Sequence, residues 1–222
     1  MSKVLVVAVH ADDETLGCAG TLLKHKSNGD EIFWFIVTSI NQDNSVSQSK
    51  ILERKMEIKK VKEEYGFAET IELCLPARKV DKIPMHELIA KISEVFNRIK
   101  PSIVYLPFRN DAHSDHRVVF EAAYSCTKSF RQPFIKKILM METISETEFS
   151  PSMKDCVFIP NYFIDISLFI NEKLRIMSIF KNELGEHPFP RNLDNIKALA
   201  VFRGASSGCK YAESFMLLRE IW

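Results

Sequence analysis

The chain has few cysteines and glycines and almost no net charge, and each shortage excludes a class of protein. Five cysteines are scattered through 222 residues without a CxxC pair, which argues against a disulfide framework or a cysteine-built zinc site and favours a reducing compartment. Seven glycines and nine prolines exclude collagen-like and low-complexity architectures. Thirty Lys and Arg against twenty-nine Asp and Glu give a formal charge of +1, so bulk charge attracts neither nucleic acid nor an anionic membrane.

Long hydrophobic runs are also missing. Residues 4–9 form an apolar run that is too short to span a bilayer, and it leads directly into the largely ionisable residues 10–14. A signal peptide would not tolerate such a continuation. Because hydrophobic residues still make up 46% of the chain, it can bury a substantial core. We therefore expect a soluble, cytoplasmic protein without membrane insertion, in which residues 1–222 form a single domain.

Hydrophobic patterning alternates between two periods along the chain. Short continuous apolar runs predict buried parallel strands, and apolar residues at helical spacing predict helices between them. Strands are expected at residues 4–9, 32–37, 70–75, 103–106, 138–142 and 163–166, and helices at residues 15–26, 51–65, 85–99, 118–128, 172–181 and 193–201. We expect a loop at residues 39–49, and either a strand or a helix at residues 211–218.

This alternation predicts an α/β fold, namely a Rossmann-like three-layer sandwich with a mostly parallel sheet, because parallel strands need helical crossovers. Ligands of such open sheets bind beyond the C-terminal ends of the strands, so the active site is expected at that edge. No GxGxxG motif follows the first expected strand, and dinucleotide binding is therefore not supported.

Ionisable side chains concentrate in the loops that follow two of the expected strands. Residues 10–14 read HADDE, and residues 107–116 read PFRNDAHSDH. Capping a helix needs one oxygen acceptor only, and three adjacent acids repel one another unless a cation is present. Two loops of this kind at one edge of a sheet therefore predict a metal site.

The residue types limit the choice of metal. Imidazole with a single carboxylate and no thiolate suits Zn²⁺, or a neighbouring divalent transition metal such as Fe²⁺, better than calcium or magnesium. One ion per chain would be bound by the close pair His10 and Asp13 and by a distant third ligand, either His116 or His113. Two neutral imidazoles and one carboxylate leave a net positive charge, which stabilises a developing oxyanion.

The two motifs together resemble those of the PIG-L and LmbE-like zinc N-deacetylases, the family of the GlcNAc-phosphatidylinositol, mycothiol and bacillithiol deacetylases. The resemblance extends over essentially the whole chain and includes Arg54 with Glu57, residues 141–143, residues 147–149 and residues 211–215. Ala11 and Ser114 stand where the family usually has proline, so the first turn is less constrained in φ. Neither departure removes a ligand or a proton carrier.

The resemblance implies roles for the residues of the first motif and for one of the second. His10, Asp13 and His116 would bind Zn²⁺. Asp12, which lies beside the ligands in the sequence, would be the general base that takes a proton from the attacking water. These roles agree with the chemistry, because a bound Zn²⁺ lowers the pKa of water to about 7 and a nearby carboxylate completes its deprotonation.

Further residues are assigned to acid chemistry and to substrate binding. His113 would stabilise the oxyanion or protonate the leaving amine, oriented in part by Asp115. Arg54 matches a family arginine that reaches toward the substrate, but an exposed charge on an amphipathic helix is an equally good interpretation. Arg109 and Asn110 are expected to bind substrate because they lie just upstream of the second motif.

The resemblance therefore predicts a zinc-dependent hydrolase that removes an acetyl group from an N-acetylated amino sugar or its conjugate. A GlcNAc glycoside, a nucleotide sugar and a thiol precursor all fit as substrates. Two alternatives stay open, namely a metal-dependent phosphoesterase, which usually needs two metals, and a non-catalytic sugar- or nucleotide-binding module of the same fold. The sequence identifies neither the exact substrate nor the oligomeric state, although members of the family often form trimers or hexamers, so a homo-oligomer stays open.

Overall fold

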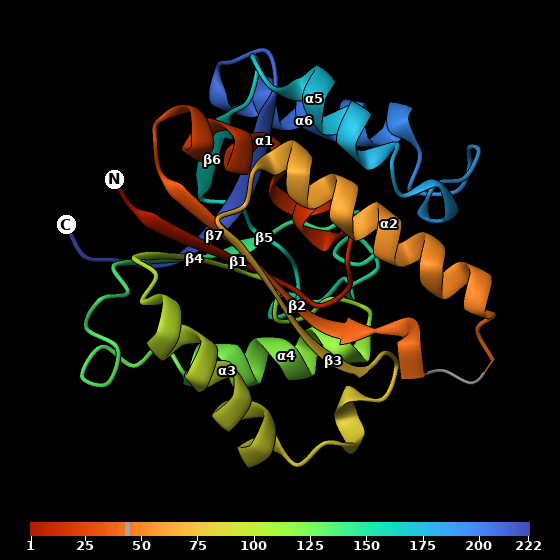
Figure 1. Ribbon diagram of the computed structural model, residues 1–222. Coiled ribbons are helices and arrows are strands. Elements are labelled where there is room, and N and C mark those ends of the chain that lie inside the picture. Colours follow the sequence, from red (N-terminus) through yellow and green to blue (C-terminus); the bar gives the residue numbers. More distant parts are fainter. Residues whose placement is uncertain (43–44) are drawn as a thin grey trace.

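The computed structural model describes residues 1–42 and 45–222 and shows one twisted sheet between two layers of helices (Figure 1). The described strands form a mixed sheet in the order β3-β2-β1-β4-β5-β7-β6. Strands β1 to β5 run parallel, and β7 runs antiparallel to both of its neighbours. The strands are Lys3–Ala8 (β1), Glu31–Ser39 (β2), Glu69–Pro76 (β3), Ile103–Leu106 (β4), Lys137–Met141 (β5), Tyr162–Asp165 (β6) and Ala212–Glu220 (β7).

The helices divide between the two faces of this sheet. Helices α1, α2, α5 and α6 cover one face, and α3 and α4 cover the other (Figure 1). Their bounds are Asp13–Ser27 (α1), Gln48–Tyr65 (α2), Met85–Ile99 (α3), Ser114–Ser125 (α4), Ile170–Met177 (α5) and Leu193–Ser207 (α6). Short 3-10 helices lie at Ile40–Gln42 (η1), Val80–Lys82 (η2) and Lys181–Glu183 (η3). The prediction of an α/β sandwich with a mostly parallel sheet is confirmed.

The central strand β1 explains the two apolar layers. Its residues are buried from Val4 onward, and successive side chains of a strand point to opposite faces of the sheet. Val4 and Val6 pack in the core beneath α1, whereas Leu5 and Val7 pack in the core beneath α3. A strand with both faces covered must be apolar throughout, which is why this segment reads as a continuous run.

Several element boundaries differ from those expected. Helix α4 begins at Ser114, within the second motif, because the imidazole of His113 accepts a hydrogen bond from the amide of Asp115 and caps the helix. The segment left open between strand and helix is the strand β7. The expected loop at residues 39–49 contains η1 and the first turn of α2, and its residues 43–44 lie outside the described residues.

Helix α1 is interrupted at Cys18, whose φ of −150° and ψ of 27° are not helical. The interruption frees backbone groups on either side of it from their helical partners. The freed amides of Gly20 and Thr21 donate to the two carboxylate oxygens of Glu213 on β7, at 2.9 and 2.8 Å. Glu213 therefore acts as an N-terminal cap for the second part of α1.

Lys173 on α5 satisfies the other side of this interruption. Its Nζ atom donates to the carbonyl oxygen of Leu16 at 2.8 Å and to Oε1 of Glu213 at 2.7 Å. Lys173 and Glu213 are both buried, so they form an ion pair inside the protein that joins α1, α5 and β7. This pair stabilises the helix that begins within the HADDE motif.

No helix in the described ranges is both long enough and apolar enough to cross a membrane.

Candidate active site

The two motif loops meet at the topological switch point of the sheet, where successive strands are added first on one side of β1 and then on the other. The chain continues from β1 to β2 and β3 on one side, and β4 and β5 lie on the other side of β1. The loops after β1 and β4 therefore leave neighbouring strands at their C-terminal ends and enclose a crevice. Residues 10–13 span the first loop and the start of α1, and residues 111–116 span the second loop and the start of α4, so the structure brings the two motifs together.

Three side chains form a compact triangle at the bottom of this crevice. His116 Nε2 lies 3.4 Å from Asp13 Oδ2 and 3.4 Å from His10 Nδ1, and His10 Nδ1 lies 3.9 Å from Asp13 Oδ2. Tetrahedral Zn²⁺ with bonds of about 2.0–2.1 Å separates its ligand atoms by about 3.3 Å. The donor set and its spacing therefore fit a divalent transition metal.

The carboxylate of Asp13 is held in place by the backbone. Its Oδ2 atom accepts hydrogen bonds from the amides of Val9 at 2.9 Å and His10 at 2.8 Å. The end of β1 and the start of the loop thus orient the acid that faces both imidazoles. Asp13 is buried, so these two amides and the facing imidazoles are the polar partners of its carboxylate.

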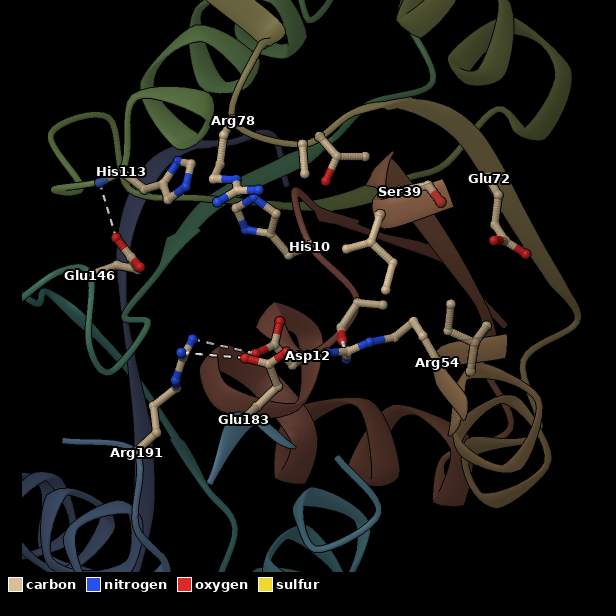
Figure 2. Close-up of a pocket in the computed structure, with 15 residues that line it drawn as sticks. His10, Asp12, Ser39, Arg54, Glu72, Arg78, His113, Glu146, Glu183 and Arg191 are labelled. Carbon is tan, nitrogen blue, oxygen red and sulfur yellow. Dashed lines mark hydrogen bonds and ion pairs between the residues drawn. The ribbon is translucent and has the colours of Figure 1, made fainter. Parts of the chain in front are cut away.

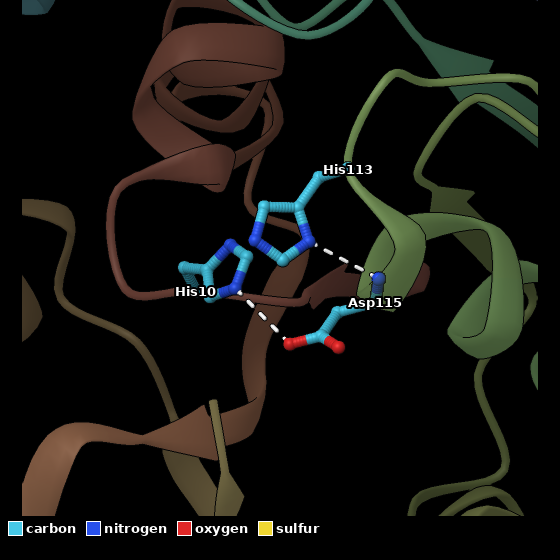
Figure 3. Close-up of side chains that lie close together, drawn as sticks. All are labelled: His10, His113 and Asp115. Atoms are coloured by element: carbon cyan, nitrogen blue, oxygen red, sulfur yellow. Dashed lines mark hydrogen bonds and ion pairs between the residues drawn. The ribbon is translucent and has the colours of Figure 1, made fainter. Parts of the chain in front are cut away.

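Each imidazole of the triangle has its own carboxylate partner behind it. His116 Nδ1 donates to Asp111 Oδ2 at 2.8 Å, and Asp111 Oδ1 accepts from Thr147 Oγ1 at 2.7 Å. Behind the other imidazole, His10 Nε2 faces Asp115 Oδ2 at 3.6 Å (Figure 3). Carboxylates in such positions fix the tautomer and the ring orientation of histidines that bind metals. Burial by itself lowers the pKa of His116, but Asp13 and Asp111 outweigh it and raise that pKa to about 9.

Asp115 contacts both His113 and His10, through different groups. Its carboxylate accepts hydrogen bonds from the backbone amides of Arg78 at 2.6 Å and Val80 at 3.2 Å, and it faces His10. Its own backbone amide donates a hydrogen bond to His113 Nδ1 at 3.1 Å. Asp115 therefore orients His113 through its amide and His10 through its carboxylate. A second grouping of possible metal ligands, His10 with His113 and Asp115, shares His10 with the triangle.

His113 points its free ring edge toward the cavity in a defined protonation state. Because Nδ1 accepts a hydrogen bond, the proton of the neutral ring is on Nε2. Burial and the neighbouring His10 lower the pKa of His113 to about 4, which keeps the ring neutral near pH 7. Glu146 also holds the loop that precedes α4, because its Oε2 atom accepts a hydrogen bond from the backbone amide of His113 at 3.0 Å. A neutral N–H donor suits an oxyanion better than it suits proton transfer to an amine.

Asp12 lies beside the triangle and is not used as a helix cap. It stands at the N-cap position of α1, but its carboxylate makes no capping hydrogen bond. Its nearest cationic neighbour is Arg191, whose Nη1 lies 3.6 Å from Oδ2 (Figure 2). Burial, followed by the negative charges of Asp13 and Glu183, raises the pKa of Asp12 to about 7. A carboxylate with this pKa is suited to accept a proton near neutral pH.

The three residues expected to bind substrate differ in their positions. Arg54 lines the cavity and is mostly buried, so it is not an exposed charge on the surface of α2; it donates to the carbonyl of Ala11 at 2.8 Å and pairs with Glu183. Arg109 is exposed and lies outside the cavity lining. Asn110 also lies outside the lining and donates to the carbonyl of Asp155 at 3.1 Å.

A cavity of about 450 Å³ opens above His10, Asp12 and His113. This volume suits a small-molecule ligand. Its remaining walls come from β2, α2, β3 and later loops, as Figure 2 shows, and consist of Ala11, Thr38, Ser39, Ile40, Arg54, Ile58, Glu72, Ala77, Arg78, Glu146, Glu183 and Arg191.

Several residues of the site had no role assigned from the sequence, among them Asp111, Glu146, Glu183 and Arg191. Asp111 lies inside the second motif, where its proximity to the histidines was a usable signal. Arg191 Nη2 lies 3.3 Å from Glu183 Oε2. Glu183 ends the short helix η3, and Arg191 lies in the irregular chain between η3 and α6. Such a segment has no periodicity to indicate which side chains turn inward.

A protein-family model and a known protein both match this chain. The family model described as "PIG-L: GlcNAc-PI de-N-acetylase" matches residues 5–127. A diacetylchitobiose deacetylase of Thermococcus kodakarensis is 25% identical over 233 residues, covering 100% of this chain and 85% of that protein.

Solved structures share the fold over nearly the full length. The conserved protein TT1542 from Thermus thermophilus superposes with a TM-score of 0.80 at 23% identity, covering 100% of this chain and 97% of its own. The N,N′-diacetylchitobiose deacetylase from Pyrococcus horikoshii has a TM-score of 0.78 at 19% identity, covering 98% and 84%.

Proposed function

The chain belongs to the PIG-L family of de-N-acetylases and is an enzyme of that family, and we propose that it is a zinc-dependent hydrolase of N-acetylated amino sugars or their conjugates. The observation that carries this proposal is the triangle of His10, Asp13 and His116 beside the carboxylate of Asp12. Two relatives named as diacetylchitobiose deacetylases support a GlcNAc-type substrate.

We infer that His10, Asp13 and His116 would hold the metal. A divalent ion held by these residues would supply Lewis-acid chemistry, that is, it would polarise the acetyl carbonyl and lower the pKa of a water molecule. Asp12 accepts a proton from the attacking water as the water oxygen forms its bond to the carbonyl carbon. Arg191 keeps the Asp12 carboxylate facing the cavity, and Glu183 in turn pairs with Arg191.

His113 and Asp12 complete the reaction in this proposal. The Nε2–H group of His113 donates a hydrogen bond to the oxygen that gains negative charge when water adds. When the C–N bond breaks, the amine nitrogen needs a proton, and neutral His113 is poorly suited to supply it. Asp12 holds the proton it took from water and can return it to the amine, which yields acetate and a free amino sugar.

The phosphoesterase alternative has less support. That chemistry usually uses two metals about 3.5–4 Å apart with separate ligands. In the described part of the chain, the two groupings that could hold a metal both need His10. The arrangement therefore favours one ion per chain and amide hydrolysis.

Amide hydrolysis is tested by incubating the zinc-loaded protein with N,N′-diacetylchitobiose and with a panel of phosphate mono- and diesters. We expect free amine and acetate to appear in equal amounts from the sugar, because water cleaves one amide bond per turnover. Release of phosphate without amine supports the phosphoesterase instead. Binding of the sugar by fully metal-loaded protein without any turnover supports a non-catalytic binding module.

Three broader features of the chain stay predictions. One domain over residues 1–222 is supported by the single sheet to which both halves of the chain contribute strands. A reducing compartment such as the cytoplasm is supported by the odd number and scattered positions of the five cysteines, which include no CxxC pair. A homo-oligomer stays open on the family resemblance alone, and light scattering measures the oligomeric state.

A further inference from the structure

A second groove adjoins the candidate active site along helix α2 and strand β3. It has a volume of about 460 Å³, and it shares Ile58 and Glu72 with the cavity above the triangle. In Figure 2, Glu72 lies on the opposite side of that cavity from His113 and Glu146. A substrate with its acetyl group near His113 can therefore extend past Glu72 into the groove.

The wall that α2 contributes to this groove is cationic. Lys55, Lys59 and Lys62 follow one another at helical spacing on the same side of the helix and all line the groove. Together they extend over about 10 Å of helix. Their side chains are exposed, and within the described residues none of them forms an ion pair.

Most charged side chains of α2 are separated by sign, with three lysines on one side of the helix and the acids on the other. Solvation of the helix does not by itself need such a separation. A solvated helix usually mixes both signs in pairs four residues apart. The acids of α2 line the grooves on its other side, together with Lys60; these acids are Glu53, Glu57, Glu63 and Glu64. Among the described residues that line the lysine groove, Glu72 is the single acid, so three positive charges face one negative charge.

The opposite wall adds a neutral donor. Thr70 on β3 lines the groove, and its hydroxyl is buried without a hydrogen-bond partner among the described residues. Buried hydroxyls are normally paired, so this unpaired one next to a cationic wall is a donor that a bound acceptor could use. Phosphate oxygens accept hydrogen bonds from hydroxyls and attract lysine side chains as point charges.

We propose that the groove lined by Lys55, Lys59 and Lys62 binds a phosphate-bearing substituent of the substrate. The inference rests on the proposed deacetylase function and narrows it, because the preferred substrate becomes an N-acetyl amino sugar with an anionic group attached. The part that carries the acetyl group occupies the cavity at His10, and the phosphate occupies the groove beyond Glu72.

The test compares one anionic and one neutral substrate, UDP-N-acetylglucosamine and N,N′-diacetylchitobiose. The triple variant Lys55→Gln, Lys59→Gln, Lys62→Gln is expected to lose about tenfold in kcat/KM for the anionic substrate, since three exposed ion pairs are removed. Its kcat/KM for the neutral substrate is expected to stay unchanged. Raising the salt concentration is expected to weaken the preference of the unmodified protein for the anionic substrate.

A matched pair of single variants controls for general effects on the helix. Lys59→Gln and Lys60→Gln remove the same charge from adjacent exposed positions of α2, but these positions line different grooves. Lys59→Gln is expected to lower kcat/KM for UDP-N-acetylglucosamine, and Lys60→Gln is expected to leave it unchanged. Equal effects of the two variants overturn the proposal.

A binding measurement separates failure of the groove from failure of the proposed function. In zinc-loaded Asp12→Asn protein, which is expected to turn over about 10²- to 10⁴-fold more slowly, calorimetry measures the Kd of UDP-N-acetylglucosamine directly. A weaker Kd when the three lysine substitutions are added supports the groove. An unchanged Kd overturns it, even if neutral sugars are deacetylated. Absence of any deacetylation by the unmodified enzyme counts against the proposed function instead.

Discussion

Replacing Asp12 with asparagine is expected to reduce kcat by about 10²- to 10⁴-fold while the protein still binds one Zn²⁺ per chain. Asparagine has nearly the same size as aspartate but cannot accept a proton from water. The Asp12 carboxylate makes no capping hydrogen bond to α1, so the substitution removes no structural hydrogen bond there. Turnover is measured by amine release, and the zinc content by atomic absorption on the same sample.

Asp115→Asn is the contrasting variant. Asp115 faces the imidazole of His10 and not the cavity, so this change is expected to weaken zinc binding by about 10- to 100-fold. Turnover should recover when excess zinc is supplied, whereas Asp12→Asn should not respond to zinc. Undiminished activity of Asp12→Asn at full zinc occupancy removes Asp12 from the mechanism.

Replacing Lys173 with methionine is expected to lower the free energy of unfolding by about 3–5 kcal/mol. The change leaves the Glu213 carboxylate buried without its cationic partner, and it removes the donor to the Leu16 carbonyl. Methionine fills a similar volume, so the loss reports on charge and hydrogen bonding more than on packing. Urea denaturation followed by circular dichroism measures the midpoint and the slope.

Two further variants identify the source of that loss. Adding Glu213→Gln to Lys173→Met is expected to cost less than the sum of the two single changes, because both remove the same ion pair. Lys24→Met, which removes a lysine with a surface contact to the Asp165 carbonyl, is expected to change stability by about 0.5 kcal/mol or less. A small effect of Lys173→Met, similar to that of Lys24→Met, contradicts a stabilising role for the buried pair.

The fold class could be predicted because burial on both faces leaves a direct trace in the sequence. The segment from Val4 onward is apolar throughout since each of its faces meets a different helical layer. The antiparallel direction of β7 could not be predicted in this way, because no pattern in the sequence indicates it. Strand β7 pairs antiparallel with both β5 and β6, and this arrangement depends on contacts between distant segments of the chain.

The site was predictable where its residues adjoin the ends of strands. His10, Asp13 and His116 follow β1 and β4, and the sheet order makes these strands neighbours. The carboxylate partner of each histidine was harder to predict from the sequence, because a pairing such as that of His116 with Asp111 depends on how the turn folds. Arg191 reaches Asp12 across 179 positions of sequence (191 − 12), and no local pattern indicates such a contact.

The most direct test of the account is the stoichiometry of zinc activation. Metal-free protein, prepared with a chelator and then freed of it, is titrated with Zn²⁺ while amine release from N,N′-diacetylchitobiose is measured. The account predicts no activity without metal and a linear rise that ends at one equivalent per chain, since His10, Asp13 and His116 form one site. Full activity of the metal-free protein, or a rise that ends only at two equivalents, contradicts it.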